Sequence, residues 1–111
     1  MKHYERVCAY VNLDAILHNY EEIKKRIDKH TKIIGVIKTD GYGHGAIAIG
    51  KELEKVDYVW GYAVATAEEG FILRKAGLNK PILVLGYTFP YAYEEMINLD
   101  IRPALFRVDS L

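Results

Sequence analysis

The chain has 111 residues, of which 50% are hydrophobic and 27% are charged, a composition typical of one soluble globular domain at most. Its 15 basic and 15 acidic residues cancel, which argues against a surface built for nucleic acid or for an anionic membrane. No apolar run approaches the roughly 20 residues that span a bilayer, and the start lacks the apolar segment and cleavage site of a secretory signal.

The first predicted element is an amphipathic helix that Asp14 begins as N-cap. Behind Asp14, apolar side chains recur at steps of three and four residues, at Ile16, Tyr20, Ile23 and Ile27. A short apolar piece, residues 9–11, precedes this helix. Cys8 is the single cysteine and can form neither an internal disulfide nor a zinc site. We interpret it as a small, half-buried apolar side chain in a reducing, cytoplasmic compartment.

Four strands follow, with a helix between each pair. The strands are predicted at residues 33–37, 58–65, 81–85 and 104–107, and the helices at 45–54, 66–77 and 90–99. Thr66 and Glu69 predict a capping box, and Gly77 has the position of a C′ residue. Pro90 suits the first turn of its helix, whereas Pro103 weakens the start of the fourth strand.

The predicted strands are apolar on both faces, which is typical of parallel sheets in α/β proteins. Right-handed βα units of this length fit either a doubly wound sheet or a TIM barrel, and the pattern alone leaves both open. A TIM barrel needs eight strands and about 250 residues. Because a further helix is expected to start near residues 108–111, the chain resembles the front part of something larger.

Lys38 is the first residue after the strand at 33–37. Ligands collect at the carboxyl ends of parallel strands in both architectures, so the Lys38 amine is expected to reach into a binding region. A lysine amine can attack a carbonyl and form a Schiff base. The alternative is that Lys38 ends the strand and extends its amine into water.

A glycine-rich loop follows the lysine, and it allows positive φ angles and close approach of a ligand. The helix that begins near Gly45 would offer its N-terminus to an anion such as phosphate. The spacing is neither the dinucleotide G-x-G-x-x-G nor a P-loop. Tyr42 could donate a hydrogen bond to a phosphate or cover the strand ends, and we expect His44 to help cap the next helix rather than perform chemistry.

The segment VIKTDGYGHGA, residues 36–46, resembles the lysine motif of bacterial alanine racemases, commonly written V-K-A-N-A-Y-G-H-G. The resemblance covers nearly the whole chain. It includes residues 11–16, which are similar to the opening segment of the family, residues 62–70, which match its second strand and following helix, and residues 81–86, which match its third strand. Residues 39–41 depart from the common A-N-A, a change that we expect to be harmless.

The resemblance implies the (β/α)₈ barrel of the fold-type III pyridoxal-phosphate enzymes. Residues 1–111 would be its N-terminal part, with the other half of the barrel and a C-terminal β domain beyond them. Lys38 would carry pyridoxal phosphate as a Schiff base and act as one of two catalytic bases. Tyr42 would contact the cofactor phosphate, and Leu85 would line the pyridoxal ring. The family interconverts L- and D-alanine for peptidoglycan synthesis and completes its site with a tyrosine of the partner subunit in a homodimer.

Three alternatives remain open at this point. The first is a serine or broad-specificity racemase, which shares this front segment. The second is a pyridoxal-phosphate-binding barrel of the cofactor-homeostasis kind, without racemase activity. The third is a nucleotide-binding α/β module that uses GYGHG as a phosphate cradle. We also expect the 111 residues alone to lack racemase activity and to self-associate, because half a barrel leaves strand edges and core side chains exposed.

Overall fold

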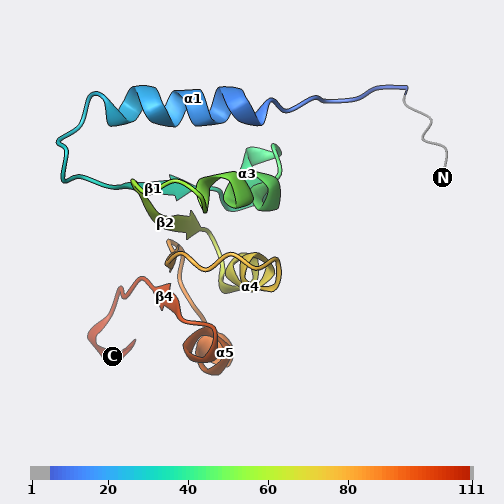
Figure 1. Ribbon diagram of the computed structural model, residues 1–111. Coiled ribbons are helices and arrows are strands. Elements are labelled where there is room, and N and C mark those ends of the chain that lie inside the picture. Colours follow the sequence, from blue (N-terminus) through green and yellow to red (C-terminus); the bar gives the residue numbers. More distant parts are fainter. Residues whose placement is uncertain (1–5, 111) are drawn as a thin grey trace.

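The computed structural model describes residues 6–110, which form one four-stranded parallel sheet with helices packed on one of its faces (Figure 1). The strands are β1 (Ile33–Val36), β2 (Val59–Val64), β3 (Ile82–Val84) and β4 (Ile101–Pro103). Each strand pairs in parallel with the next one along the chain, in the order β1-β2-β3-β4. This arrangement confirms the predicted fold class, the first half of a (β/α)₈ barrel.

The helices alternate with the strands, as predicted. They are α1 (Leu13–Lys24), α2 (Lys38–Tyr42), α3 (Ala46–Leu53), α4 (Ala67–Lys75) and α5 (Tyr93–Asn98), with short 3₁₀ turns η1 (Pro90–Ala92) and η2 (Val108–Ser110). The capping box of α4 is present, and Gly77 follows that helix with a φ angle of 94°. Within residues 6–110, none of these helices has the length and apolar character needed to cross a membrane.

The core lies between the sheet and the helices α3, α4 and α5. Tyr62 and Ile82 from the strands and Leu53 from α3 are each 0% exposed. On β1, Gly35 faces this layer, and an added Cβ there would lie 2.8 Å from the Tyr20 hydroxyl of α1. The glycine therefore lets α1 approach the sheet closely.

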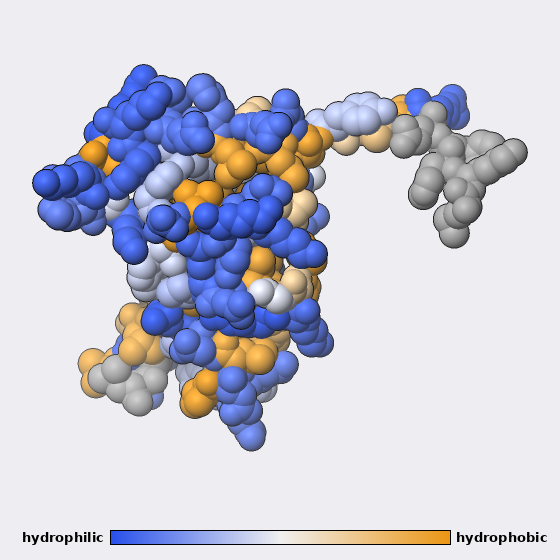
Figure 2. Space-filling view, viewed as in Figure 1, coloured by the Kyte–Doolittle hydropathy of each residue, from blue (hydrophilic) through white to orange (hydrophobic). Residues whose placement is uncertain are grey.

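The opposite face of the sheet carries apolar side chains that no helix covers. Ile34 and Val36 alternate with the buried Gly35 and Ile37 and are each 41% exposed. Apolar surface is also present near the C-terminal end of the described chain, where Figure 2 shows hydrophobic residues beside hydrophilic ones and where Leu105 and Phe106 are 52% and 61% exposed. In an eight-stranded barrel this open face would form the interior.

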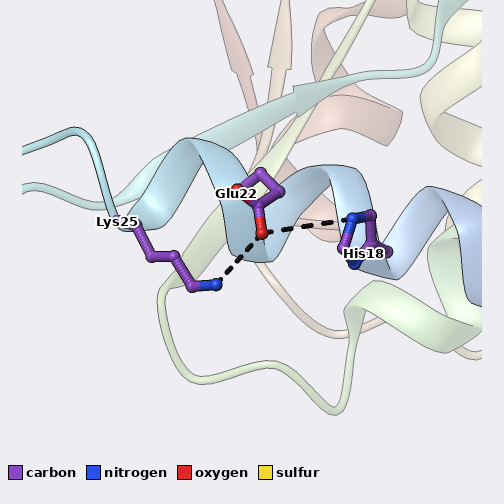
Figure 3. A network of polar contacts seen from close by, with 3 residues as sticks. All are labelled: His18, Glu22 and Lys25. Carbon is purple, nitrogen blue, oxygen red and sulfur yellow. Dashed lines mark hydrogen bonds and ion pairs between the residues drawn. The ribbon is translucent and has the colours of Figure 1, made fainter.

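The outer surface of α1 is polar and exposed. Glu22 Oε1 lies 3.0 Å from Lys25 Nζ and 4.0 Å from His18 Nε2, so Glu22 is the centre of a small polar network at this end of the chain (Figure 3). The hydrogen bond from Lys25 lowers the pKa of the Glu22 carboxyl, and the same bond raises the pKa of Lys25. Because these groups are solvated, the network contributes little to stability and identifies this side of α1 as a water-facing surface.

Two expectations at the N-terminal end are wrong. The N-cap of α1 is Asn12, whose Oδ1 accepts the N–H of Ala15 at 3.1 Å, and Asp14 lies inside the first turn. An asparagine is as good an N-cap as an aspartate, so the pattern did not separate the two. Cys8 is exposed rather than half-buried.

The fourth strand was predicted too late in the chain. It covers Ile101–Pro103 instead of residues 104–107, because Ile101 is the side chain that fills the core, at 5% exposure. Pro103 pairs with Val84 and is the last residue of the strand. Proline has no N–H to extend the ladder, so the apolar residues after it leave the sheet.

Candidate functional site

The candidate site lies at the carboxyl ends of the strands, where each strand passes into the next helix. Lys38 follows β1 there and is half-buried. Ile37, just before it, donates its N–H to the Ala63 carbonyl of β2 at 3.0 Å. Among the residues that the structure describes, the Lys38 amine makes no hydrogen bond or ion pair. It is therefore an unengaged amine at the end of an open apolar face.

The backbone after Lys38 turns in the left-handed sense. Thr39, Asp40, Gly41 and Tyr42 have φ angles of 54°, 53°, 64° and 58°, respectively. We expected a loop made flexible by its glycines, but three of these four residues are not glycine. Left-handed conformation costs such residues about 1–2 kcal/mol each, so the rest of the structure must hold this turn in place.

Asp40 closes the turn against α3. Its Oδ1 accepts the N–H of Ala46, the first residue of α3, at 2.9 Å, and its carbonyl accepts the N–H of Gly45 at 2.9 Å. The expected capping role of His44 is wrong, because the His44 ring nitrogen Nδ1 lies 3.1 Å from the Gly41 carbonyl instead. Since an acidic side chain occupies the start of α3, this helix is poorly suited to hold a phosphate.

Glu69 joins the turn to the neighbouring strand end. Its Oε2 accepts the N–H of Thr39 at 2.7 Å, and its Oε1 accepts the N–H groups of Ala65 at 2.6 Å and of Thr66 at 3.2 Å. The sequence predicted only the capping box within α4. The bond to Thr39 spans 30 residues, and no local pattern indicates it.

Tyr42 and Leu85 lie at the same end of the sheet as Lys38. Tyr42 ends α2 and is 60% exposed, and Leu85 follows β3 and is 41% exposed. Leu85 donates its N–H to the Val64 carbonyl at 2.8 Å, so β2 separates it from Lys38 by two strand spacings, about 10 Å in all. The three residues lie at the carboxyl ends of their strands, but no hydrogen bond joins their side chains.

The side chains at the carboxyl ends of these strands have the chemistry needed to bind a planar aromatic aldehyde. An amine without a partner can attack a carbonyl, the apolar Val36 and Leu85 leave surface for a ring, and the Tyr42 hydroxyl is accessible as a hydrogen-bond donor. Within residues 6–110 no three His, Cys, Asp or Glu side chains gather in a way that could hold a metal ion.

Comparison with known proteins supports the resemblance to alanine racemases that the lysine motif indicated. Residues 11–111 match the family model described as the alanine racemase N-terminal domain. The chain is 46% identical over 100 residues to alanine racemase 1 of Caldanaerobacter subterraneus subsp. tengcongensis. It is 45% identical over 87 residues to an amino-acid racemase of Enterococcus faecalis.

Solved structures show the same similarity in three dimensions. The alanine racemase of Clostridium difficile 630 superposes with a TM-score of 0.86 at 42% identity, over 90% of this chain and 26% of that one. Coverage is equally uneven in sequence: the Caldanaerobacter match covers 88% of this chain and 25% of the relative, and the Enterococcus match covers 78% and 12%. The chain therefore spans about a quarter or less of the length of these relatives.

Proposed function

Because the chain belongs to the alanine racemase N-terminal domain family, we propose that it forms the lysine-bearing part of a pyridoxal-phosphate site that racemises alanine. The observation that carries this proposal is the unengaged Lys38 amine at the end of β1, beside the open apolar face of the sheet. In this proposal residues 1–111 correspond to the N-terminal part of the barrel domain.

Each residue of the site has a distinct task. Pyridoxal phosphate, when bound, takes up the electron pair that remains when a proton leaves the α-carbon of the amino acid. Lys38 holds the cofactor and, once its amine is free, moves a proton at one face of that carbon. Tyr42 would donate a hydrogen bond from its hydroxyl to the phosphate, and Leu85 would contribute apolar surface for the ring.

Racemisation also needs a proton-transfer group on the opposite face of the α-carbon. Among residues 6–110 we assign only Lys38 to this task, so we expect that the chain does not interconvert alanine enantiomers by itself. The resemblance to the family assigns the second group to a tyrosine of a partner subunit, which makes a homodimer part of the proposal. The proposal also includes a cytoplasmic location for the protein.

Reductive trapping tests the role of Lys38 on the 111-residue chain. The chain is incubated with pyridoxal phosphate at a concentration below that of the protein, reduced with borohydride, digested and analysed by mass spectrometry. We expect the adduct mainly on Lys38, and we expect Lys38→Arg to abolish it there without redirecting it. Lys51→Arg, on the exposed surface of α3, is the matched control and should leave labelling unchanged. Equal labelling of all exposed lysines would contradict the proposal.

A second candidate is racemisation of serine or of several amino acids. The similarity to a protein named amino-acid racemase favours including it, since that name specifies no single substrate. A full-length protein that contains these 111 residues, assayed with alanine and with serine, distinguishes the candidates. Turnover of alanine but not serine supports the first, turnover of both supports the second, and cofactor binding without turnover supports a homeostasis-type barrel.

A further inference from the structure

The Glu69 carboxylate connects two loops that are far apart in the sequence. One oxygen binds the N–H of Thr39, directly after Lys38, and the other binds the N–H groups of Ala65 and Thr66, directly after β2. We propose that Glu69 is a positioning residue that fixes the backbone at Lys38 and so directs its amine toward the bound carbonyl group. This inference rests on the proposed function of Lys38.

The backbone of Lys38 is held on both sides. On the strand side, the N–H of Ile37 binds the Ala63 carbonyl at 3.0 Å. On the helix side, the N–H of Thr39 binds Glu69 at 2.7 Å. Between these two bonds the chain leaves β1 and enters the left-handed turn, with φ changing from −123° at Ile37 to 54° at Thr39. The backbone fixes the direction of the Cα–Cβ bond from which the flexible lysine side chain extends, so losing either bond would change the region that the amine can reach.

The Thr39 bond also compensates for strain. Thr39 is β-branched and has a φ angle of 54°, a conformation that such residues rarely adopt. Hydrogen bonds to a charged acceptor are among the stronger ones in proteins. Without the Glu69 carboxylate, the Thr39 N–H would lose its acceptor and the turn could relax toward ordinary right-handed geometry.

Both oxygens of Glu69 accept backbone hydrogen bonds, which makes glutamine an informative substitution. In Glu69→Gln the amide oxygen can still complete the capping box with Thr66, because glutamine is accepted at that position. The amide NH₂ would then face the N–H of Thr39, and two donors repel each other. The substitution therefore separates the helix-capping task of Glu69 from its contact with the lysine turn.

Amide hydrogen exchange, followed residue by residue by NMR, tests the contact without any cofactor. In Glu69→Gln we expect the Thr39 amide to exchange about tenfold faster or more, the factor for losing one charge-assisted hydrogen bond. The Ile37 amide should keep its protection, because its acceptor is unchanged. Glu68→Gln is the matched control: its carboxylate binds the Tyr91 hydroxyl at 2.7 Å, so the Thr39 amide should be unaffected.

Reductive trapping then tests the consequence for the amine. In Glu69→Gln we expect the ratio of Lys38 to Lys51 labelling by pyridoxal phosphate to fall several-fold, whereas Thr66→Ala, which weakens only the cap of α4, should retain it. Unchanged Thr39 exchange, or unchanged Lys38 labelling despite faster exchange, would overturn the inference. Absence of selective Lys38 labelling in the unaltered chain would instead overturn the proposed function, and the Thr39 exchange would still report on the contact.

Discussion

The Tyr62 hydroxyl lies 2.5 Å from Glu54 Oε2 and 2.9 Å from the Gly50 carbonyl, in the layer between the sheet and α3. Tyr62 is 0% exposed, while Glu54 also accepts the backbone N–H groups of Asn79 at 2.7 Å and Lys80 at 3.2 Å. This pair ties β2 to the end of α3 and, through Glu54, to the segment that enters β3. It is a stabilising feature at the end of the sheet remote from Lys38.

We predict that Tyr62→Phe lowers the free energy of unfolding by about 1–3 kcal/mol, the range for losing a hydrogen bond to a charged group. Urea unfolding followed by circular dichroism at low protein concentration measures this change. Since the aromatic ring remains, the core keeps its packing and the loss reports on the hydroxyl. A change below about 0.5 kcal/mol, the lower limit for one hydrogen bond, would show that this hydroxyl is not a structural contact.

The same pair predicts how stability varies at high pH. Burial, and then the hydrogen bond to Glu54, raises the pKa of Tyr62 above its ordinary value. Below the unfolded-state pKa of about 10, Tyr62 is protonated in both states and its contribution is complete. Above that pH only the unfolded state loses the proton, so stability falls. We expect a steeper alkaline loss in the unaltered chain than in Tyr62→Phe, and parallel curves would contradict this assignment.

We predict that Tyr42→Phe weakens retention of pyridoxal phosphate by about 1–3 kcal/mol, the value of one charge-assisted hydrogen bond. The Tyr42 hydroxyl is accessible, so its removal should not disturb the fold. Absorbance titration with pyridoxal phosphate provides the affinity. Tyr58→Phe, just before β2 at the opposite end of the sheet, is the control and should have no effect. An equal affinity for pyridoxal phosphate in Tyr42→Phe and Tyr58→Phe would show that the Tyr42 hydroxyl does not contact the phosphate.

Gly61 of β2 is predicted to tolerate no side chain. An added Cβ would lie 2.3 Å from the Pro81 carbonyl oxygen, which accepts the N–H of Tyr62 at 2.8 Å. Gly61→Ala must push these backbones apart and should lower the free energy of unfolding by about 3 kcal/mol. At Gly77 the added Cβ meets no atom within 4 Å, so only its positive φ matters. Gly77→Ala should therefore cost about 1 kcal/mol, and a larger loss there than at Gly61 would refute the steric argument.

The outer strands predict self-association of the 111-residue chain. Within the described residues β1 and β4 pair on one side only, and Ile34 on β1 is 41% exposed. Strand edges of this kind pair with other copies. Sedimentation velocity should show a mass that rises with concentration, and Ile34→Lys should reduce this rise. Ile97→Lys, on the exposed side of α5, should not. A compact monomer at all concentrations would contradict the prediction.

The fold was largely predictable because its signals are local. Apolar runs gave β1, β2 and β3, and the Thr66–Glu69 spacing gave the start of α4. The position of β4 was not predictable in this way, because both Ile101 and the run after Pro103 are apolar and only tertiary packing selects between them. The register with β3 places Ile101 opposite Ile82, and this pairing fixes the position of β4.

The site was less predictable than the fold. The motif pointed to Lys38, Tyr42 and Leu85, which the structure brings to one edge of the sheet. The left-handed turn was not foreseen, since Thr39 and Tyr42 have no local preference for positive φ. Contacts made elsewhere hold it, from Glu69 on α4 and from Asp40 to the start of α3. Such long-range compensation leaves no pattern in a single stretch of sequence.

The strand order β1-β2-β3-β4 has a consequence for how the chain acquires its structure during synthesis. Within residues 6–110, β2, β3 and β4 each pair with the strand made immediately before them, so the edge on which each of these strands docks is formed before it leaves the ribosome. None of these three pairings waits for a distant segment, and the loops closed at each step are short, which favours rapid pairing. The growing edge always belongs to the newest strand. A nascent chain can therefore build this sheet by sequential addition, in the direction of translation.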